Sequence, residues 1–316
     1  MSFSIQRITK QGLELVLLQD NDSQTQAAIL PKYGGILNGL SIIVDGERIN
    51  LIESYPDETA AGNVSRSFLS SKLSPFVCRM ANAQYTLNGK LFEIERKFVD
   101  GNAIHGLLYD KAFTIVSEFS DDEKASVTLK YNYKNDDKGY PFSYRCEVTY
   151  TLLPHYLLKI ETVITNLDDE TIPLSDGWHP YFSLGGKIND WQLYFNADAM
   201  VEFNDKLIPT GQLVEYNTFN EEKPIGETFL DNCFLLKQDE TIPCCTIYNP
   251  ENKTGISFYP DSSYPYLQIY TPPHRNSIAI ENLSSVPDAF NNKMGLILLE
   301  PRRTKNFTVH YKIERE

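Results

Sequence analysis

Short segments in which apolar and polar residues alternate recur along the whole chain, and this period of two constrains the fold most. The clearest examples are residues 126–133, 145–152 and 157–165. Because successive side chains of a strand point to opposite faces, such segments bury one side and expose the other. Gly, Pro, Asn and Asp separate the segments, and helical periodicity is nearly absent. The pattern predicts an all-β protein, a large antiparallel β-sandwich.

A tight turn is predicted at Asn88 and Gly89, which stand between two strand-forming runs at 85–87 and 90–92. The sequence contains no repeat of fixed period, and its Pro and Gly residues fall singly at turns without forming a linker. Sandwich proteins often exceed about 200 residues as one domain. We therefore expect residues 1–316 to form a single domain.

Charge and cysteine content narrow the function classes. The formal net charge of -13 disfavours nucleic acid as a partner, because binding the phosphate backbone requires clustered Lys and Arg. The sequence shows neither a secretory signal nor an apolar run of the roughly 20 residues that span a bilayer. The five cysteines are odd in number and lack CxxC spacing. We expect a cytoplasmic protein without membrane contact, whose cysteines are reduced and mostly buried.

Two of the five histidines stand in segments that suit a binding site. His105 and His179 are flanked by residues that bend the backbone, which places them at a loop or strand end, where binding groups concentrate. Aromatic residues surround His179, an arrangement that suits a sugar but is also typical of a core. Hydrogen bonding to a nearby carbonyl is the alternative role for both. We expect structural or surface roles for the other three, His155, His274 and His310.

Glu281 is the third unusual residue, because it stands at the end of an apolar strand over 277–280. Burial without a partner raises the pKa of a carboxyl group, which makes it a candidate general base. The alternative is an exposed Glu281, or one paired with an arginine such as Arg79 or Arg275.

Common signatures of other chemistries are missing from the sequence. It contains no GxSxG, HExxH, P-loop or GxGxxG pattern. The histidines and carboxylates also lack the close spacing of metal ligands. These observations favour acid–base chemistry without a cofactor or metal.

Four segments, in order along nearly the whole chain, resemble the aldose 1-epimerase (galactose mutarotase-like) family. A fifth segment resembles the acidic sugar-binding stretch of that family. The four are 75–80 with the later 87–90, then 102–106, then 177–182, then 270–273 leading to Glu281 and 287–290; the fifth is 230–234. The resemblance implies a galactose mutarotase-like supersandwich with an open cleft. It also implies a cofactor-free isomerase that interconverts the α and β anomers of a free hexose.

The resemblance assigns roles to individual residues. His179 would be the general acid and Glu281 the general base. Arg79 and His105 would hydrogen-bond the monosaccharide near its reacting end, and Asp231 would accept hydrogen bonds from its hydroxyl groups. To these we add Trp178 as a wall of the pocket, on the strength of its position beside His179.

Two departures from the family pattern suggest an outlying branch with its own sugar preference. Cys78 stands where many relatives have asparagine, and Leu107 stands where many have a second glycine.

Other readings stay open. A hexose 6-phosphate epimerase of the same fold would need basic residues such as Arg66, Lys72 or Arg275. A carbohydrate-binding protein that has lost catalysis would not need both His179 and Glu281. A glycosidase would call for two carboxyl groups. The chain could act as a monomer or a homodimer.

Overall fold

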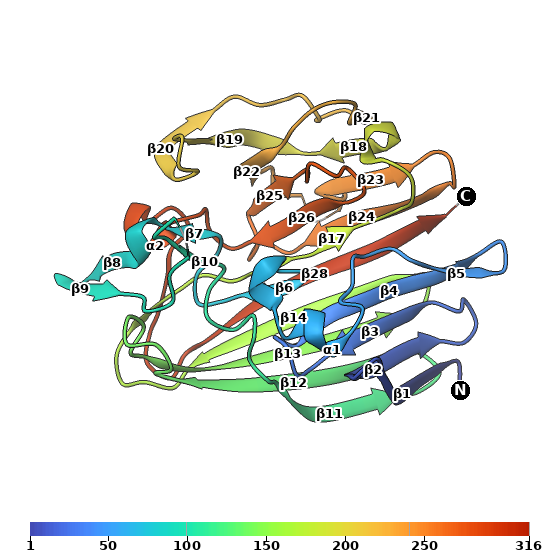
Figure 1. The fold of residues 1–316 in the computed structure, drawn as a ribbon, viewed down its shortest axis with the longest axis horizontal. Coiled ribbons are helices and arrows are strands. Elements are labelled where there is room, and N and C mark those ends of the chain that lie inside the picture. The colour runs from blue at the N-terminus through green and yellow to red at the C-terminus, as the bar shows by residue number, and fades with distance from the viewer. Residues whose placement is uncertain (99, 240, 316) are drawn as a thin grey trace.

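The computed structural model describes residues 1–98, 100–239 and 241–315, and it confirms the all-β, antiparallel architecture (Figure 1). The N-terminal sheet consists, in order, of β1 (Phe3–Lys10), β2 (Leu13–Asp20), β3 (Gln26–Leu30), β4 (Ile36–Val44) and β5 (Glu47–Asn50). The largest sheet runs in the order β11 (Thr114–Ser120), β12 (Ala125–Lys134), β13 (Ser143–Leu153), β14 (Leu157–Asn166), β28 (Thr304–Arg315), β24 (Thr254–Pro260), β23 (Cys245–Asn249), β18 (Gln192–Phe195) and β21 (Lys223–Pro224).

A third sheet carries most of the residues discussed below. It runs in the order β20 (Pro209–Val214), β19 (Ala197–Phe203), β22 (Asp231–Leu236), β25 (Tyr266–Tyr270), β26 (Ile278–Leu283), β16 (Gly177–His179) and β6 (Ser71–Leu73), and β17 (Tyr181–Phe182) also pairs with β26. Short pairs join β7 (Arg79–Met80) to β10 (Ala103–Ile104), β8 (Gln84–Leu87) to β9 (Lys90–Glu93), and β15 (Ile172–Leu174) to β27 (Ile297–Leu299). The helical elements are α1 (Glu58–Ala61), α2 (Ala289–Asn292) and the 3₁₀ turns η1 (Val64–Arg66), η2 (Ala81–Ala83) and η3 (Ile188–Asp190).

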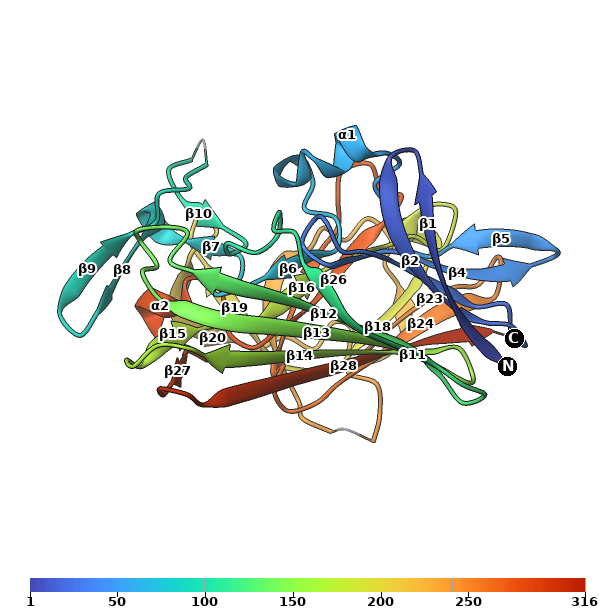
Figure 2. The same cartoon turned by 90° about the horizontal axis from the view of Figure 1, so that it is seen from below.

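Aromatic side chains join the largest sheet to the third sheet in a common core. Tyr150 of β13 lies 6.0 Å from Trp178 of β16, and Phe258 of β24 lies 4.9 Å from Phe182 of β17, measured between ring centroids. Figure 2 shows the β8–β9 hairpin projecting at one end of the molecule, and both termini at the other end. The buried rings hold the two sheets face to face, as expected for a sandwich.

The strand predictions are confirmed. The segments 126–133, 145–152 and 157–165 lie in β12, β13 and β14, and the burial of successive residues alternates along β14. Asn88 and Gly89 form the tight turn between β8 and β9, and both have positive φ angles. The stretch 287–291 contains most of the short helix α2. The structure confirms that the five cysteines are free and buried. No helix in the described ranges is long and apolar enough to cross a membrane.

A fully buried ion pair ties β6 to the segment that enters β16. The ammonium nitrogen of Lys72 lies 2.5 Å from Oδ1 of Asp176 and 4.2 Å from the centre of the Trp178 ring. Both charged side chains are 0 % exposed. The Thr162 hydroxyl accepts a hydrogen bond from Lys72, and the Tyr264 hydroxyl donates one to Asp176. Burial raises the pKa of Asp176, whereas the Lys72 charge lowers it.

Removing one partner of this ion pair should be strongly destabilising. In Lys72→Met, the Asp176 carboxylate would stay buried without its counter-ion, and we expect the free energy of unfolding to fall by about 3–5 kcal/mol. The double variant Lys72→Met/Asp176→Leu should recover most of this loss, because no unpaired charge remains. Urea denaturation of the three proteins measures the effect. A single variant as stable as the wild type would contradict this account.

Candidate active site

One cavity brings together five of the six residues that the sequence assigned to a site. It has a volume of about 560 Å³, and its lining includes Arg79, His105, His179, Asp231 and Glu281. A volume in this range is ordinary for a small-molecule site. Four of these residues belong to β7, β16, β22 and β26, and His105 directly follows β10, so segments far apart in the sequence build the cavity.

His179 and Glu281 are in contact with each other in the lining of the cavity. Nε2 of His179 lies 3.4 Å from Oε1 of Glu281, and the side chains are only 7 % and 2 % exposed. Pairing of β16 with β26 at Gly177 and Leu283 brings the two residues to the same place. Every residue of β26 is buried, so the Glu281 carboxyl group lies inside the sheet structure and has little access to water. The only hydrogen bond formed by this carboxyl group among the described residues comes from the Cys78 thiol, whose sulfur lies 3.9 Å from Oε2.

Burial shifts the pKa values of these two groups in opposite directions. It raises the pKa of Glu281 well above its ordinary value; the nearby Asp231 adds to the rise, and the Cys78 thiol opposes it. Burial lowers the pKa of His179 to about 4. Desolvation favours the uncharged imidazole and the protonated carboxyl group, so the pair holds one proton over a wide pH range.

Arg79 lies on β7, and His105 directly follows β10, which pairs with β7 at Arg79 and Ile104. The backbone N–H of His105 donates to the Cys78 carbonyl at 2.9 Å, and His105 has a φ of 61°. The imidazole ring meets the ring of His179 edge to face, with 4.7 Å between centroids. Burial, His179 and Arg79 lower the pKa of His105 well below its ordinary value. His105 is therefore a neutral hydrogen-bonding group next to the pair.

Asp231 enters the cavity from β22, beside a glutamine that the sequence analysis missed. Gln268 of β25 stands opposite Glu281 of β26, and its side-chain amide donates to Oδ1 of Asp231 at 2.9 Å. Burial raises the pKa of Asp231, whereas Arg79 and the Gln268 hydrogen bond lower it. The polar Gln268 in the middle of an apolar strand was the signal that could have identified it.

Our assignment of Trp178 to the pocket wall is wrong. Trp178 is buried against Lys72 and Tyr150 and is not among the residues that line the cavity. The reason is the alternation of side chains along a strand, which turns Trp178 to the face opposite His179. Tyr181, two residues after His179, lines the cavity instead, with its ring centroid 5.0 Å from that of His179.

The three basic residues considered for a phosphate group lie in different surroundings. Lys72 is fully buried in its ion pair with Asp176. Arg275 donates to the side chain of Asn189 and to the carbonyl oxygens of Gly226 and Thr228, so its guanidinium group is used within the protein. Arg66 alone of the three lines the cavity.

The two family departures also have different positions. Cys78 lines the cavity and contacts Glu281, whereas Leu107 is buried in the hydrophobic core. Burial raises the pKa of the Cys78 thiol well above its ordinary value, so the group is a protonated donor. Of the two departures, Cys78 is the one that touches the pair.

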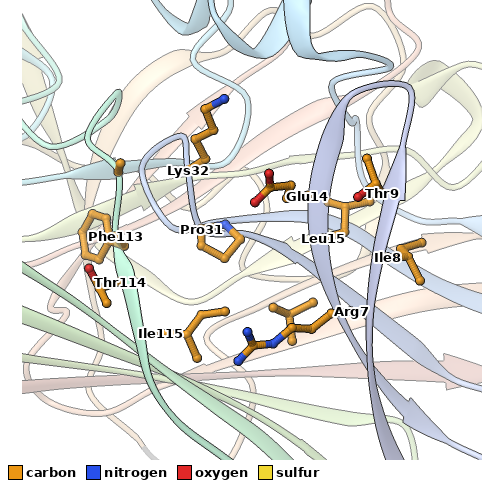
Figure 3. A pocket seen from close by; sticks show the side chains of 12 residues that line it. Arg7, Ile8, Thr9, Glu14, Leu15, Pro31, Lys32, Phe113, Thr114 and Ile115 are labelled. Carbon is orange, nitrogen blue, oxygen red and sulfur yellow. The ribbon is translucent and has the colours of Figure 1, made fainter.

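A second cavity, of about 540 Å³, lies between the β1–β2 hairpin and the start of β11 (Figure 3). Figure 3 shows apolar side chains such as Leu15, Phe113 and Ile115 around it. Its lining cations are paired, because Arg7 binds Glu118 and Lys32 binds Glu58. None of the residues that the sequence assigned to a site lines this cavity.

Comparison with known proteins identifies the class to which this fold and cavity belong. The family model described as aldose 1-epimerase matches residues 14–312. The chain belongs to the aldose 1-epimerase family, and it is an isomerase of the epimerase class.

The similarity to individual relatives is low but extends over much of the chain. The chain is 24% identical to a maltose epimerase from Levilactobacillus brevis, over 94% of both chains. It is 27% identical to an aldose 1-epimerase from Haemophilus influenzae, over 70% of this chain and 66% of that protein. The solved structure of a galactose mutarotase-like protein from Clostridium acetobutylicum superposes with a TM-score of 0.87 at 19% identity, over 100% of this chain and 99% of that one. Such distances fit an outlying branch.

Proposed function

We propose that this protein is an aldose 1-epimerase that interconverts the α and β anomers of a free hexose by acid–base ring opening and reclosure. The observation that carries the proposal is the buried contact between His179 and Glu281 inside the cavity. The anomeric hydroxyl and the ring oxygen of a pyranose are bonded to the same carbon. An acid and a base a few ångströms apart can therefore serve both oxygens at once.

The reaction moves two protons in a balanced way. Glu281 takes the proton of the anomeric hydroxyl while His179 gives one to the ring oxygen, and the bond between C1 and the ring oxygen breaks to leave an aldehyde. Rotation about the C1–C2 bond exposes the other face of the carbonyl. Reclosure returns both protons, since the hydroxyl gives its proton back to His179 and the carbonyl oxygen receives the one held by Glu281.

Both pKa shifts support this direction of proton transfer. A lowered pKa makes the imidazolium of His179 a stronger acid, and a raised pKa makes the carboxylate of Glu281 a stronger base. Ring opening converts the charged arrangement of the pair, imidazolium with carboxylate, into the uncharged one, which burial favours. Arg79 and His105 would stabilise the charge that develops on the sugar oxygens, and Asp231 would accept hydrogen bonds from hydroxyl groups.

The cavity favours a neutral sugar over a hexose 6-phosphate. Three carboxyl groups, those of Glu53, Asp231 and Glu281, line it together with only two guanidinium groups, those of Arg66 and Arg79. Arg79 already lies 3.6 Å from Asp100. Recognition of a phosphate dianion usually relies on several charge-assisted hydrogen bonds, and two of the three expected donors are engaged elsewhere.

The change in optical rotation of freshly dissolved α-D-glucose and α-D-galactose, with and without the protein, tests this function. We expect faster equilibration of at least one of these sugars, and a smaller effect on α-D-glucose 6-phosphate. If the protein accelerates the equilibration of α-D-glucose 6-phosphate alone, the result would contradict the proposal and favour a hexose 6-phosphate epimerase. No acceleration of either free hexose would favour a binding protein without catalysis.

The pH dependence should reflect a pair that holds one proton. Below about pH 4, His179 is protonated as well, so the pair holds two protons and no base remains. Above the raised pKa of Glu281 the shared proton is lost and no acid remains. We therefore expect kcat/KM, corrected for spontaneous mutarotation, to be flat through neutrality with an acid limb near pH 4. An acid limb near pH 6.5, the ordinary value for histidine, would contradict the desolvation of His179.

We also propose a cytoplasmic location, which is supported by the five reduced cysteines. The choice between monomer and homodimer and the single domain over 1–316 stay predictions.

A further inference from the structure

The cavity is larger than a single hexose requires. A hexose has twelve non-hydrogen atoms, which would fill roughly 360 Å³ even if each took the ~30 Å³ of a liquid water molecule. The cavity measures about 560 Å³. Partly exposed polar side chains, including those of Glu53 and His274, also line it. Space and hydrogen-bonding groups therefore continue beyond the pair.

A row of aromatic rings leads from the catalytic pair towards the surface. Tyr181 lies 5.0 Å from His179, Tyr270 lies 6.4 Å from Tyr181, and Phe229 lies 6.5 Å from Tyr270, all measured between ring centroids. Tyr181 and Tyr270 line the cavity, and Phe229 stands beside Tyr270 just outside the lining residues. Phe229 is 65% exposed, so the row ends in an open aromatic ring.

The backbone on both sides of Phe229 is held in place. Arg275 donates to the Thr228 carbonyl at 2.9 Å and to the Gly226 carbonyl. The Leu230 N–H donates to the Thr271 hydroxyl at 2.8 Å, and the Leu230 carbonyl accepts from the Thr271 N–H at 2.9 Å. An exposed ring on a fixed backbone can bind a flat apolar surface with little loss of conformational entropy.

We propose that Tyr270 and Phe229 form a binding site for a second sugar ring, so that the protein accepts, besides a free hexose, the reducing end of a disaccharide or longer oligosaccharide. This inference rests on the proposed function, because it places the reducing sugar at His179 and Glu281. Only the reducing sugar has a free hemiacetal, so the next ring must extend away from the pair. The C–H face of that ring would pack on Phe229, and its hydroxyl groups would meet partly exposed polar residues of the lining such as Glu53 and His274.

Binding measurements test this site without relying on turnover. Isothermal titration calorimetry gives the Kd of glucose, maltose, cellobiose and isomaltose, which present α-1,4, β-1,4 and α-1,6 linkages. We expect at least one disaccharide to bind about 2- to 10-fold more tightly than glucose, the range that one aromatic contact provides. Phe229→Ala should remove this difference and leave the Kd of glucose unchanged. Phe229→Trp should retain it.

Two controls make the result specific. Phe119→Ala removes another exposed ring, 49% exposed on β11, and should change none of the Kd values. Phe229→Leu keeps an apolar side chain without a ring face and should behave like the alanine variant. The site is refuted if no disaccharide binds more tightly than glucose, or if the preference survives in Phe229→Ala. Tight disaccharide binding by a protein that accelerates no anomerisation would refute the proposed function but not this site.

Discussion

Glu281→Gln is expected to lower kcat for anomerisation by about 10²- to 10⁴-fold, the usual contribution of one acid–base group. The amide has nearly the same shape as the carboxyl group but cannot take a proton from the anomeric hydroxyl. It also carries no charge in a place where Glu281 is only 2 % exposed. The variant should therefore be at least as stable as the wild type. Initial rates of optical rotation, together with thermal unfolding, separate loss of catalysis from loss of fold.

A matched control uses another strand glutamate. Glu161→Gln changes a side chain on β14 that pairs with Lys159 and does not line the cavity. Its kcat should equal that of the wild type. If Glu281→Gln also keeps near wild-type turnover, Glu281 is not the base.

His179→Asn is expected to cause a loss of similar size, about 10²- to 10⁴-fold in kcat. Asparagine can still form hydrogen bonds in this position, but it cannot deliver a proton to the ring oxygen. The acid limb of the pH profile, expected near pH 4, should also disappear from the residual activity, because it reports the titration of His179. His310→Asn is the control, since His310 lies on β28 and does not line the cavity.

The fold-reductions in kcat caused by Glu281→Gln and by His179→Asn should not multiply in the double variant. Because acid and base act on the same sugar in one step, removing either disables the other. The double variant should have about the same residual kcat as each single variant. Losses that multiply would indicate that the two residues act in separate steps.

The sequence predicted the strands well where one face is buried and the other is exposed. β12, β13 and β14 show this alternation, and their positions were correct to within a few residues. Prediction was weaker where both faces are buried, because an apolar run has no period that tells one face from the other. β16 and β26 are strands of this kind, and all their residues are buried.

That difference explains the main error in the candidate site. The aromatic residues around His179 were recognised, but the sequence did not reveal which of them share its face. Trp178 turns into the core and Tyr181 into the cavity. Lys72 is a second residue whose surroundings the sequence alone did not reveal. A lysine is rarely buried, so only the tertiary structure reveals its partner Asp176.

The long-range contacts of the site were accessible only through family resemblance. The segments that carry Arg79, His105, His179, Asp231 and Glu281 are far apart in the chain, and their side chains meet in one cavity. Spacing along a strand does not predict such a meeting. Gln268 was missed because it belongs to none of the segments that carried the resemblance, although it contacts Asp231.

The central claim is that the pair of His179 and Glu281 opens and recloses a free sugar ring. Exchange spectroscopy by proton NMR on glucose at anomeric equilibrium tests it most directly. Exchange between the α and β H1 signals reports ring opening without any net reaction. We expect the exchange rate to rise in proportion to the wild-type protein concentration, and to stay at the spontaneous rate with equal amounts of Glu281→Gln. An exchange rate that is unchanged by wild-type protein, for both glucose and galactose, would contradict the account.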